Sequence, residues 1–439
     1  MRVLPSLLLL AAAVPALASA QIRPPSAAPA PSPRVSVTPE PGSDLTVTLL
    51  TMGVGEQVWE QFGHNAIWIS DRSVPPSRGG PVDVVYNYGL FDFNQPHFIP
   101  RFLQGRMRYS MGGFTLASTL EEYRERDRTV WAQELDLTPA QRRQLADFLV
   151  WNALPENRDY NYDYYRDNCS TRVRDALDRV LGGVIRARFG NQTTGHSYRW
   201  HTLRLTQVNP LLATGIDIGL GRRGDREMTA WQEMFLPMKL RDYLRELRVP
   251  DADGAGSAGG AQRPLVKREW VMYESRSHQE PPQPPRWMPV FLVIGLSVGA
   301  LFALLGTRAV RGASAARIWA GAVFALWCFA AGILGLLLVL LWTATDHVFA
   351  HRNENVLLFN PLWLVLVVLL PLAIAKGRLW RTTRALVLLL AGLGVVALVM
   401  HVVGLSRQSN GWSIALALPP MLGMTWTMLV GRGRARVRD

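Results

Sequence analysis

The amino-acid sequence predicts an α+β domain outside the cytoplasm, followed by a transmembrane domain of five helices. Three features indicate this organisation: an apolar leader over residues 1–20, mixed composition over residues 44–249, and mostly apolar sequence over residues 288–430. The 439 residues carry a formal net charge of +13 at pH 7. Because much of that charge lies in the joints between apolar stretches, we expect it to orient the chain in a membrane, and we predict no nucleic-acid partner.

Residues 1–20 are typical of a secretory signal peptide. A positively charged start is followed by an apolar run, and the segment ends in the small residues Ala18, Ser19 and Ala20, a pattern found at cleavage sites. We expect cleavage before Gln21, and the alternative is an uncleaved membrane anchor. Residues 21–43 are rich in proline, alanine and serine, which predicts an extended linker.

Five apolar stretches are long enough to cross hydrocarbon, which takes about 20 residues. They cover residues 288–307, 318–343, 356–375, 385–404 and 411–430. Lysine and arginine are concentrated in the joints at 308–317 and 376–384 and in the tail at 431–439. Since cytoplasmic loops hold the excess of these residues, the odd number of spans places residues 21–287 outside.

Local patterns predict the elements of the exported domain. Residues 45–53 and 65–69 read as strands, and residues 81–93 as a strand pair or a strand and turn. Thr138 followed by Pro139 is typical of a helix start. Residues 250–287 are rich in glycine and proline and predict a linker, within which residues 266–275 alternate like a strand.

The chain has two cysteines, and Cys169 is the one outside the apolar stretches. Apolar residues at helical spacing follow it, so it opens a predicted helix. The unpaired N–H groups and the positive dipole at a helix N-terminus lower the pKa of a thiol, which favours a nucleophilic thiolate. The alternative is a buried small hydrophobe, but its polar neighbours Asn168, Ser170 and Thr171 favour the nucleophile.

A thiol nucleophile needs a base, and His64 is the best-placed candidate, directly after a glycine at the start of a predicted strand. The alternative is a histidine bonded to backbone at a strand end. His97, His196, His201 and His278 are the other histidines of this region. No cysteine pair offers a disulfide or zinc site, and we predict no metal and no cofactor.

Three segments together resemble one family. "FGHNAIWI", "YNYGLFDF" and "YDYYRDNCSTRVRDAL" are similar to the exported domain of the Lnb family of bacterial lipoprotein N-acyltransferases. Segments at 215–240 and 345–363 share the resemblance, which covers about residues 45–365. More distantly, a strand histidine that precedes a helix cysteine resembles the circularly permuted NlpC/P60, or papain-like, fold.

The resemblance implies acyl transfer in the bacterial inner membrane, with the thiol domain in the periplasm. A phospholipid would acylate Cys169 as a thioester, and the free amine of a diacylglyceryl-modified cysteine on a lipoprotein would then take the acyl chain. The implied partners are therefore a membrane phospholipid, diacylated lipoproteins and the lipid bilayer. The alternatives are an NlpC/P60-like cell-wall cysteine peptidase or amidase, a membrane phospholipase, and a non-enzymatic envelope scaffold.

Further residues complete the predicted site. The resemblance to the permuted relatives implies that a polar group on the neighbouring strand orients the imidazole, with Asn87 as the first choice and Asp92 as the second. The alternative is that both are ordinary turn residues. Backbone N–H groups at Cys169 and Ser170 are expected to bind the oxyanion. The candidates for oxyanion binding or substrate positioning are Ser170, Asn168, Tyr88 and Asp92.

The loop between the second and third predicted spans is densely polar and should lie on the same side as the thiol. It contains Asp346, His347, His351, Arg352, Asn353, Glu354 and Asn355. These residues are predicted to complete a lipid or lipoprotein site at the bilayer surface. The alternative is an ordinary solvated loop.

Overall fold

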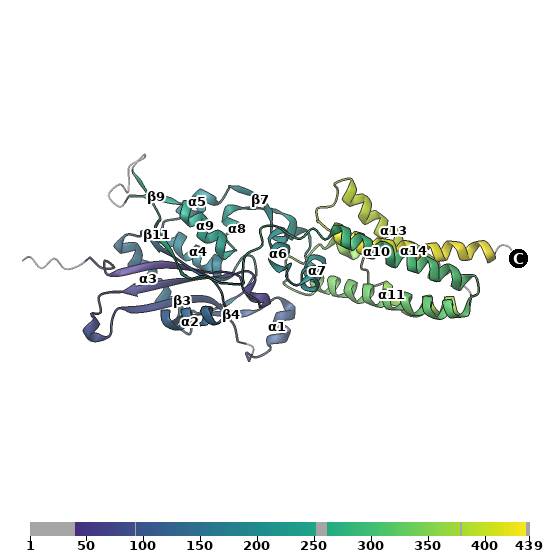
Figure 1. The fold of residues 1–439 in the computed structure, drawn as a ribbon, viewed down its shortest axis with the longest axis horizontal. Helices are drawn as coiled ribbons and strands as arrows, with labels where there is room; N and C mark the ends of the chain where they lie inside the picture. Colours follow the sequence, from purple (N-terminus) through teal and green to yellow (C-terminus); the bar gives the residue numbers. More distant parts are fainter. Residues whose placement is uncertain (1–39, 93, 252–260, 378–379, 436–439) are drawn as a thin grey trace, which may run out of the picture. The chain divides into compact units, whose positions relative to one another are not determined.

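A computed structural model of the chain describes residues 40–92, 94–251, 261–377 and 380–435. The predicted signal peptide and most of the predicted linker at 21–43 lie outside the described residues. The described chain contains an α+β domain and a group of apolar helices (Figure 1).

The α+β domain is built on a seven-stranded antiparallel sheet in the order β11-β5-β1-β2-β3-β4-β6. The strands are β1 Leu45–Met52, β2 His64–Asp71, β3 Val82–Leu90, β4 Arg108–Phe114, β5 Val130–Leu135, β6 Asp159–Asn161 and β11 Val266–Tyr273. The predicted strands at 45–53 and 65–69 are confirmed, and the segment at 81–93 forms one strand, not a pair. The edge strand β11 corresponds to the strand predicted at 266–275 within the linker at 250–287. The sheet therefore includes a strand that lies beyond residue 249, the predicted end of the domain.

The two faces of the sheet carry separate apolar cores because successive strand residues point to opposite sides. Leu49 and Ile67 face a core formed with helices α3 Pro139–Asn152 and α4 Cys169–Val180. Leu50 and Ala66 face the other core, to which helix α2 Leu116–Glu125 contributes Tyr123. The helix that opens with Cys169 therefore lies against the middle of the sheet, beside β2 and β3.

Helices α3 and α4 begin where the sequence predicts. The hydroxyl of Thr138 accepts the backbone N–H of Gln141, and Pro139 occupies the first turn. The side chain of Asn168 accepts the backbone N–H of Thr171, whose hydroxyl in turn accepts the N–H of Asn168. The N-termini of α3 and α4 are thus both capping boxes, in which side chains accept hydrogen bonds from backbone N–H groups that have no partner within the helix.

Shorter elements fill the rest of the α+β domain. They are η1 Val58–Glu60, η2 Pro76–Arg78, α1 Phe98–Gln104, α5 Val184–Phe189, β7 Thr193–Ser197, α6 Tyr198–Thr206, α7 Pro210–Gly219, η3 Arg222–Asp225, β8 Glu227–Thr229, α8 Ala230–Glu233, α9 Pro237–Glu246, β9 Arg248–Pro250 and β10 Gln262–Pro264. The buried Arg199 ties three of them together, because its guanidinium contacts Asp217 at 2.7 Å and Asp225 at 2.9 Å.

The apolar region folds into helices α10 Met288–Val310, α11 Ser314–Thr343, α12 Trp363–Ala375, α13 Arg381–Val402 and α14 Gly411–Ala435. By length and composition, four of these described helices, all but α12, can cross a membrane. Four of the five predicted membrane-spanning helices are supported by length and composition, and the fifth stays a prediction, because the segment at 356–375 forms a helix of 13 residues. At a rise of about 1.5 Å per residue, such a helix is about 20 Å long, against about 30 Å of hydrocarbon.

The first part of that segment is not α-helical, and part of it is buried. After the 3-10 turn η5 Glu354–Leu357, the chain passes close to Gly335 of α11, where an added Cβ would lie 2.6 Å from the carbonyl oxygen of Phe359. Leu358 and Phe359 are both buried in the core of the helices. Irregular backbone is tolerated at membrane depth where protein surrounds it, which hydropathy alone does not reveal.

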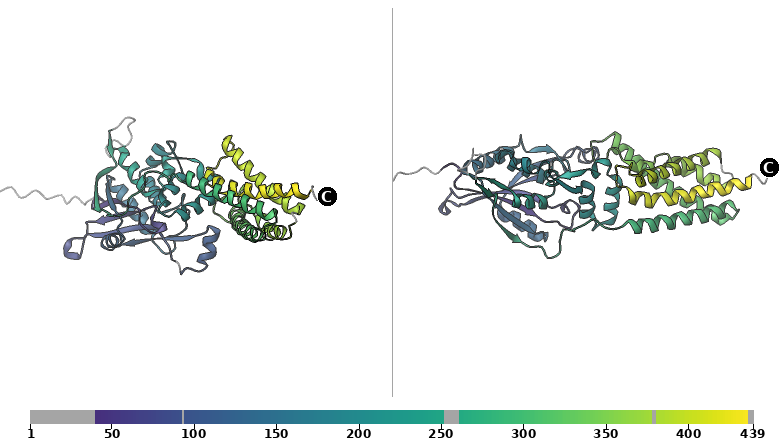
Figure 2. Two further views of the ribbon diagram at one scale, coloured as in Figure 1. Left: turned by 45° about the vertical axis from the view of Figure 1, so that its right-hand side comes forward. Right: turned by 90° about the horizontal axis from the view of Figure 1, so that it is seen from above.

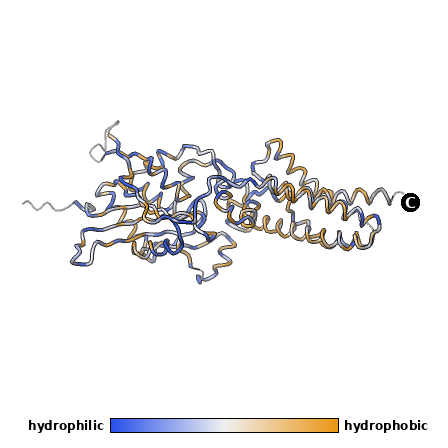
Figure 3. The backbone as a smooth tube through the Cα atoms, in the orientation of Figure 1, coloured by the Kyte–Doolittle hydropathy of each residue, from blue (hydrophilic) through white to orange (hydrophobic). Residues whose placement is uncertain are grey.

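Small residues let the helices approach closely, and apolar side chains cover their outer surface. Gly295 and Gly299 of α10 contact the backbone of α14, and the views in Figure 2 show these helices side by side. Apolar residues dominate the helical region, whereas the α+β domain is mixed (Figure 3). The rings of Trp287 and Trp412 pair at 5.6 Å where α10 and α14 begin, in the manner of an aromatic belt at a membrane surface.

Candidate functional site

The thiol of Cys169 occupies the first residue of α4 and is nearly closed off from solvent, with 8 % of the residue exposed. The backbone N–H groups of Asn65, of Ser170 and of Cys169 itself act on its sulfur and favour the charged form. Gly89 of β3 lies against it, since an added Cβ there would be 3.5 Å from the Cβ of Cys169. This glycine has a φ of +90°, so a side chain at this position would also strain the backbone.

Burial raises the pKa of the Cys169 thiol above its ordinary value. The three backbone N–H groups and the positive charge of Arg128 act in the opposite direction, but the loss of hydration outweighs them. The sequence predicted a lowered pKa and a charged sulfur, and the structure corrects this. The resting group is a neutral thiol that needs a base.

The imidazole of His64 is held by Asn87, the first choice for an orienting residue. His64 begins β2, and its Nε2 lies 3.0 Å from Oδ1 of Asn87 on β3. The Nδ2 group of Asn87 donates to the carbonyl of Val85 at 3.2 Å, which leaves Oδ1 as the acceptor. Nε2 of His64 therefore carries the proton, and its Nδ1 has a free lone pair.

Burial is also the main influence on the pKa of His64, which it lowers to about 4. The charge of Arg128 acts in the same direction, and the hydrogen bond that His64 donates to Asn87 opposes both. The imidazole is therefore neutral at physiological pH, as a general base must be. Arg128 is itself buried and is held by the carbonyl of Gly53 at 3.0 Å and by Glu60 at 3.6 Å.

The backbone links the thiol to the strand that carries the imidazole. Asn65, whose backbone N–H acts on the sulfur of Cys169, is the residue directly after His64. Within the described residues, no hydrogen bond joins the sulfur to the imidazole directly. Such contacts often tighten only when a substrate is bound.

The side chains of Asn168 and Ser170 anchor the start of α4. The Nδ2 of Asn168 donates to the carbonyls of Tyr164 and Phe235, both at 2.9 Å. The hydroxyl of Ser170 donates to the carbonyl of Met234 at 2.6 Å. Only the backbone N–H of Ser170 faces the sulfur, so these two side chains fix the helix end and do not reach the thiol.

Tyr88 and Asp92 have other partners. The hydroxyl of Tyr88 donates to Oδ1 of Asn152 at 2.8 Å, and burial raises the pKa of Tyr88 well above its ordinary value. The exposed carboxylate of Asp92 accepts the backbone N–H of Asn94 at 2.8 Å and closes a turn. The contact with His64 thus belongs to Asn87 and not to the second choice, Asp92.

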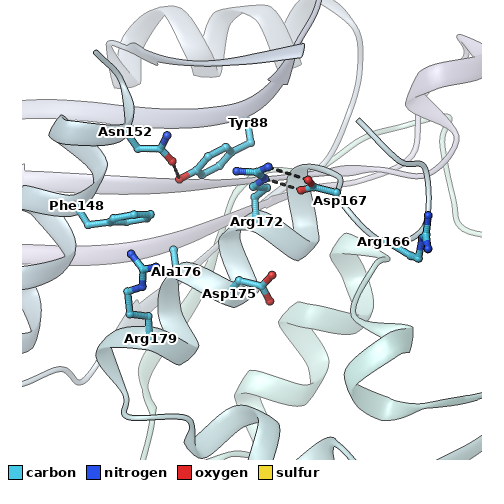
Figure 4. A pocket seen from close by; sticks show the side chains of 9 residues that line it. All are labelled: Tyr88, Phe148, Asn152, Arg166, Asp167, Arg172, Asp175, Ala176 and Arg179. Atoms are coloured by element: carbon cyan, nitrogen blue, oxygen red, sulfur yellow. Dashed lines mark hydrogen bonds and ion pairs between the residues drawn. The ribbon is translucent and has the colours of Figure 1, made fainter. Parts of the chain in front are cut away.

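A pocket of about 360 Å³ lies along α4, but it is not the thiol site (Figure 4). It is lined by Tyr88, Phe148, Asn152, Arg166, Asp167, Arg172, Asp175, Ala176 and Arg179. Neither Cys169 nor His64 is among these residues. Its most prominent contact is the ion pair of Arg172 with Asp167, at 2.7 Å between Nη2 and Oδ2.

The polar loop before α12 contacts the α+β domain at two places. At the first, Oδ2 of Asp346 lies 2.7 Å from Nε of Arg106, and Nε2 of His347 lies 2.9 Å from the carbonyl of Phe102 in α1. His351 stays within the loop, with its Nε2 2.9 Å from the carbonyl of Thr345.

The second place is buried. Nδ2 of Asn353 and Nδ2 of Asn355 both donate to the carbonyl of Ile218, at 2.8 and 3.0 Å. The carboxylate of Glu354 pairs with Arg222 at 2.6 Å. Asn353 to Asn355 are all buried, so this part of the loop is not an ordinary solvated loop. It fixes the α+β domain to the helices.

One further cluster was not predicted. His196 Nδ1 and His201 Nε2 lie 3.0 and 2.8 Å from Oε1 of Glu233, and these three atoms would be within reach of one metal ion. However, Nη2 of Arg204 lies 3.3 Å from Nδ1 of His201, which places the proton on Nε2, and the ammonium of Lys239 lies 3.7 Å from Glu233. A ligand nitrogen that carries a proton, with two cations adjacent, fits a divalent cation poorly.

These features define a membrane protein with an α+β domain that contains a buried cysteine and histidine site. The family model described as the Lnb N-terminal periplasmic domain matches residues 41–206, and that of the Lnb transmembrane domain matches residues 288–405. The chain belongs to the Lnb family, and its α+β domain is periplasmic. No curated protein and no solved structure matches the chain.

Family membership indicates a membrane-associated enzyme of lipoprotein maturation. The family models say nothing of a cysteine nucleophile, of the acyl donor or of an NlpC/P60 relationship. The roles of Cys169, His64 and Asn87 therefore stay predictions.

Proposed function

We propose that the protein transfers an acyl chain from a phospholipid to the N-terminal amine of diacylglyceryl-cysteine lipoproteins, through a thioester on Cys169. One observation carries the proposal: in an Lnb-family chain, the backbone N–H of Asn65 acts on the sulfur of Cys169, and the residue just before Asn65 is His64, whose imidazole is neutral. Asn87 holds the other nitrogen of that imidazole. Thiol, base and orienting residue are the parts that covalent acyl transfer needs.

In the first step, the sulfur of Cys169 attacks an ester carbonyl of the phospholipid while Nδ1 of His64 takes the thiol proton. The neutral state of both groups makes this a concerted proton removal and not an attack by a preformed thiolate. The tetrahedral intermediate collapses to a thioester, and the imidazolium gives its proton to the leaving lysophospholipid oxygen. The N–H groups of Asn65 and Ser170, already directed at the sulfur, would bind the oxyanion.

In the second step, the amine of the lipoprotein attacks the thioester carbonyl. His64 takes a proton from the attacking amine, the carbon–sulfur bond breaks, and the proton returns to the sulfur. The products are an amide on the lipoprotein and the free thiol, so the enzyme is restored. A thioester suits an amine acceptor because sulfur leaves more readily than the ester oxygen of the donor.

The periplasmic thiol and the basic joints require an odd number of crossings. From the loop beside the α+β domain, the chain runs through α12 to the basic joint at Lys376. Helix α13 then returns it to the side of the α+β domain, where Gln408 donates a hydrogen bond to the carbonyl of Leu220. We propose that the partly buried segment at 354–362 and the short α12 together make the fifth crossing, in the bacterial inner membrane. We also propose that the thiol domain has a permuted NlpC/P60-like fold, because His64 precedes Cys169 in the sequence.

The test is transfer by the purified full-length chain in nanodiscs that contain phospholipid with labelled acyl chains. A synthetic diacylglyceryl-cysteine lipopeptide is the acceptor. The expected result is a labelled amide on the lipopeptide, lost in Cys169→Ala and kept in the matched control Cys328→Ala. Labelled fatty acid without labelled amide would identify a phospholipase instead, and cleavage of peptidoglycan fragments would identify a cell-wall hydrolase.

A further inference from the structure

Helix α1 exposes an apolar face. Ile99 and Leu103 are 67 % and 61 % exposed, and Phe102 is also exposed. These residues are spaced three and four apart, so they share one side of the helix. Three large apolar side chains on one short surface helix are unusual in a soluble domain and are typical of a surface that meets a partner.

The position of α1 points to that partner. The backbone N–H of Asp346 donates to the carbonyl of Gln104 at 2.8 Å, and His347 bonds the carbonyl of Phe102. Gly105, which ends α1, is so close that an added Cβ would lie 2.9 Å from the backbone nitrogen of His347. Since the membrane helix α11 ends at Thr343, α1 is fixed a few residues beyond the end of a transmembrane span (Figure 1).

A second apolar surface has the same kind of position. Leu211 of α7 is 85 % exposed, and Val208 just before the helix is also exposed. At the other end of α7, Ile218 belongs to the apolar core of the membrane helices, and its carbonyl accepts from Asn353. Both α1 and α7 are thus joined to the loop that leaves the membrane.

Aromatic rings connect α1 with the thiol. The Tyr164 ring stacks on His347 at 6.1 Å between centroids, and its hydroxyl lies 3.7 Å from the sulfur of Met107. Tyr162 follows at 6.1 Å from Tyr164 and stacks on Tyr109 at 4.1 Å. We call Tyr109, Tyr160, Tyr162 and Tyr164 the tyrosine ladder. It ends at Gly89, where an added Cβ would lie within 4.0 Å of both Cys169 and the hydroxyl of Tyr160.

We propose that α1 and α7 dock into the interfacial layer of the outer leaflet, and that an acyl chain leaves the bilayer beside α1 and reaches Cys169 along the tyrosine ladder. The docking partner is the lipid bilayer, reached in continuity with the transmembrane helices. The acyl route rests on the proposed function, whereas the docking does not. The route runs outside the helix bundle, over the α+β domain.

The docking is tested by labelling single cysteines in the full-length chain in phosphatidylglycerol and phosphatidylethanolamine nanodiscs. Ile99→Cys, Leu103→Cys and Leu211→Cys are made in a Cys169→Ser, Cys328→Ala chain and labelled with a polarity-sensitive fluorophore. Val150→Cys is the matched control, because Val150 is 55 % exposed on α3 and Figure 1 places α3 away from α1. We expect spin-labelled lipid to quench the first three and aqueous iodide to quench only the control. Iodide quenching of positions 99, 103 and 211 equal to that of position 150 would overturn the docking.

The acyl route has a separate test in the chain that keeps Cys169. The double variant Ile99→Ser, Leu103→Ser should acylate Cys169 about tenfold more slowly from bilayer phospholipid, because the apolar surface beside the route is lost. It should react at the unchanged rate with a water-soluble short-chain thioester. Equal rates with phospholipid would overturn the route. Absence of any acyl adduct in the unmodified chain would instead count against the proposed function and would leave the fluorescence result standing.

Discussion

Replacement of Asn87 by aspartate tests how the site sets the basicity of His64. The side chain of Asn87 lies 3.0 Å from Nε2 of the imidazole, so Asn87→Asp places a carboxylate at hydrogen-bond distance from it with almost no change in shape. A carboxylate stabilises the imidazolium, which raises the pKa of His64 from its value of about 4.

The size of the change follows from the distance. Two unit charges about 3 Å apart interact by about 5 kcal/mol at an effective dielectric constant of about 20. Loss of the existing hydrogen bond and burial of the new carboxylate remove roughly half of this. The remainder, about 2.5 kcal/mol, corresponds to a pKa of about 6 for His64, since about 1.4 kcal/mol equals one pH unit.

The assay is the rate at which iodoacetamide alkylates Cys169 between pH 5 and 10, followed by intact mass in a Cys328→Ala background. In the unmodified chain burial raises the pKa of the thiol above its ordinary value, so the thiol is mostly neutral at pH 7 and the rate should rise steadily with pH. With Asn87→Asp, the thiolate–imidazolium pair becomes more accessible, and we expect an about tenfold faster reaction at pH 7.

The matched control is Asp92→Asn, which changes a carboxylate that only closes its own turn and should leave the profile unaltered. A folded Asn87→Asp protein with the alkylation profile of the unmodified chain would refute the assigned contact. A plateau of fast alkylation between pH 5 and 8 in the unmodified chain would show a preformed ion pair and contradict the neutral thiol.

Three further predictions concern residues around the site. Ser170→Ala should lower the free energy of unfolding by about 1–3 kcal/mol, measured by thermal unfolding, because the Ser170 hydroxyl donates to a buried carbonyl. Acyl transfer should persist at low temperature, and its loss in a stable protein would contradict this. Arg128→Met should raise the pKa of Cys169 further, because a nearby positive charge is removed, so alkylation at pH 8 should slow down; a faster reaction would contradict it. Arg222→Ala should lower the melting temperature of the protein in detergent, because buried Glu354 loses its ion pair, whereas an unchanged melting temperature would show that the contact adds nothing.

Local rules predicted much of the fold. The helix starts at Thr138 and Asn168 were readable because caps are short-range hydrogen bonds between residues three apart. The contact of His64 with Asn87 was also within reach, since two consecutive antiparallel strands place their residues opposite each other.

What the sequence did not predict depends on long-range burial. The helix N-terminus correctly indicated N–H groups at the sulfur of Cys169, but only the packed structure shows that lost hydration outweighs them. Arg128, distant in sequence from both, acts on the pKa of Cys169 and of His64, and one arginine among many gave no signal. Hydropathy likewise does not distinguish a helix from the irregular, protein-covered chain that leads into α12.

The intact mass of the full-length protein after incubation with phospholipid bilayers tests the thioester directly. We expect a mass increase equal to one acyl chain, confined to the peptide with Cys169 and removed by neutral hydroxylamine. A protein that turns over lipid or lipopeptide without ever carrying this adduct, or that carries it on another residue, would contradict the account.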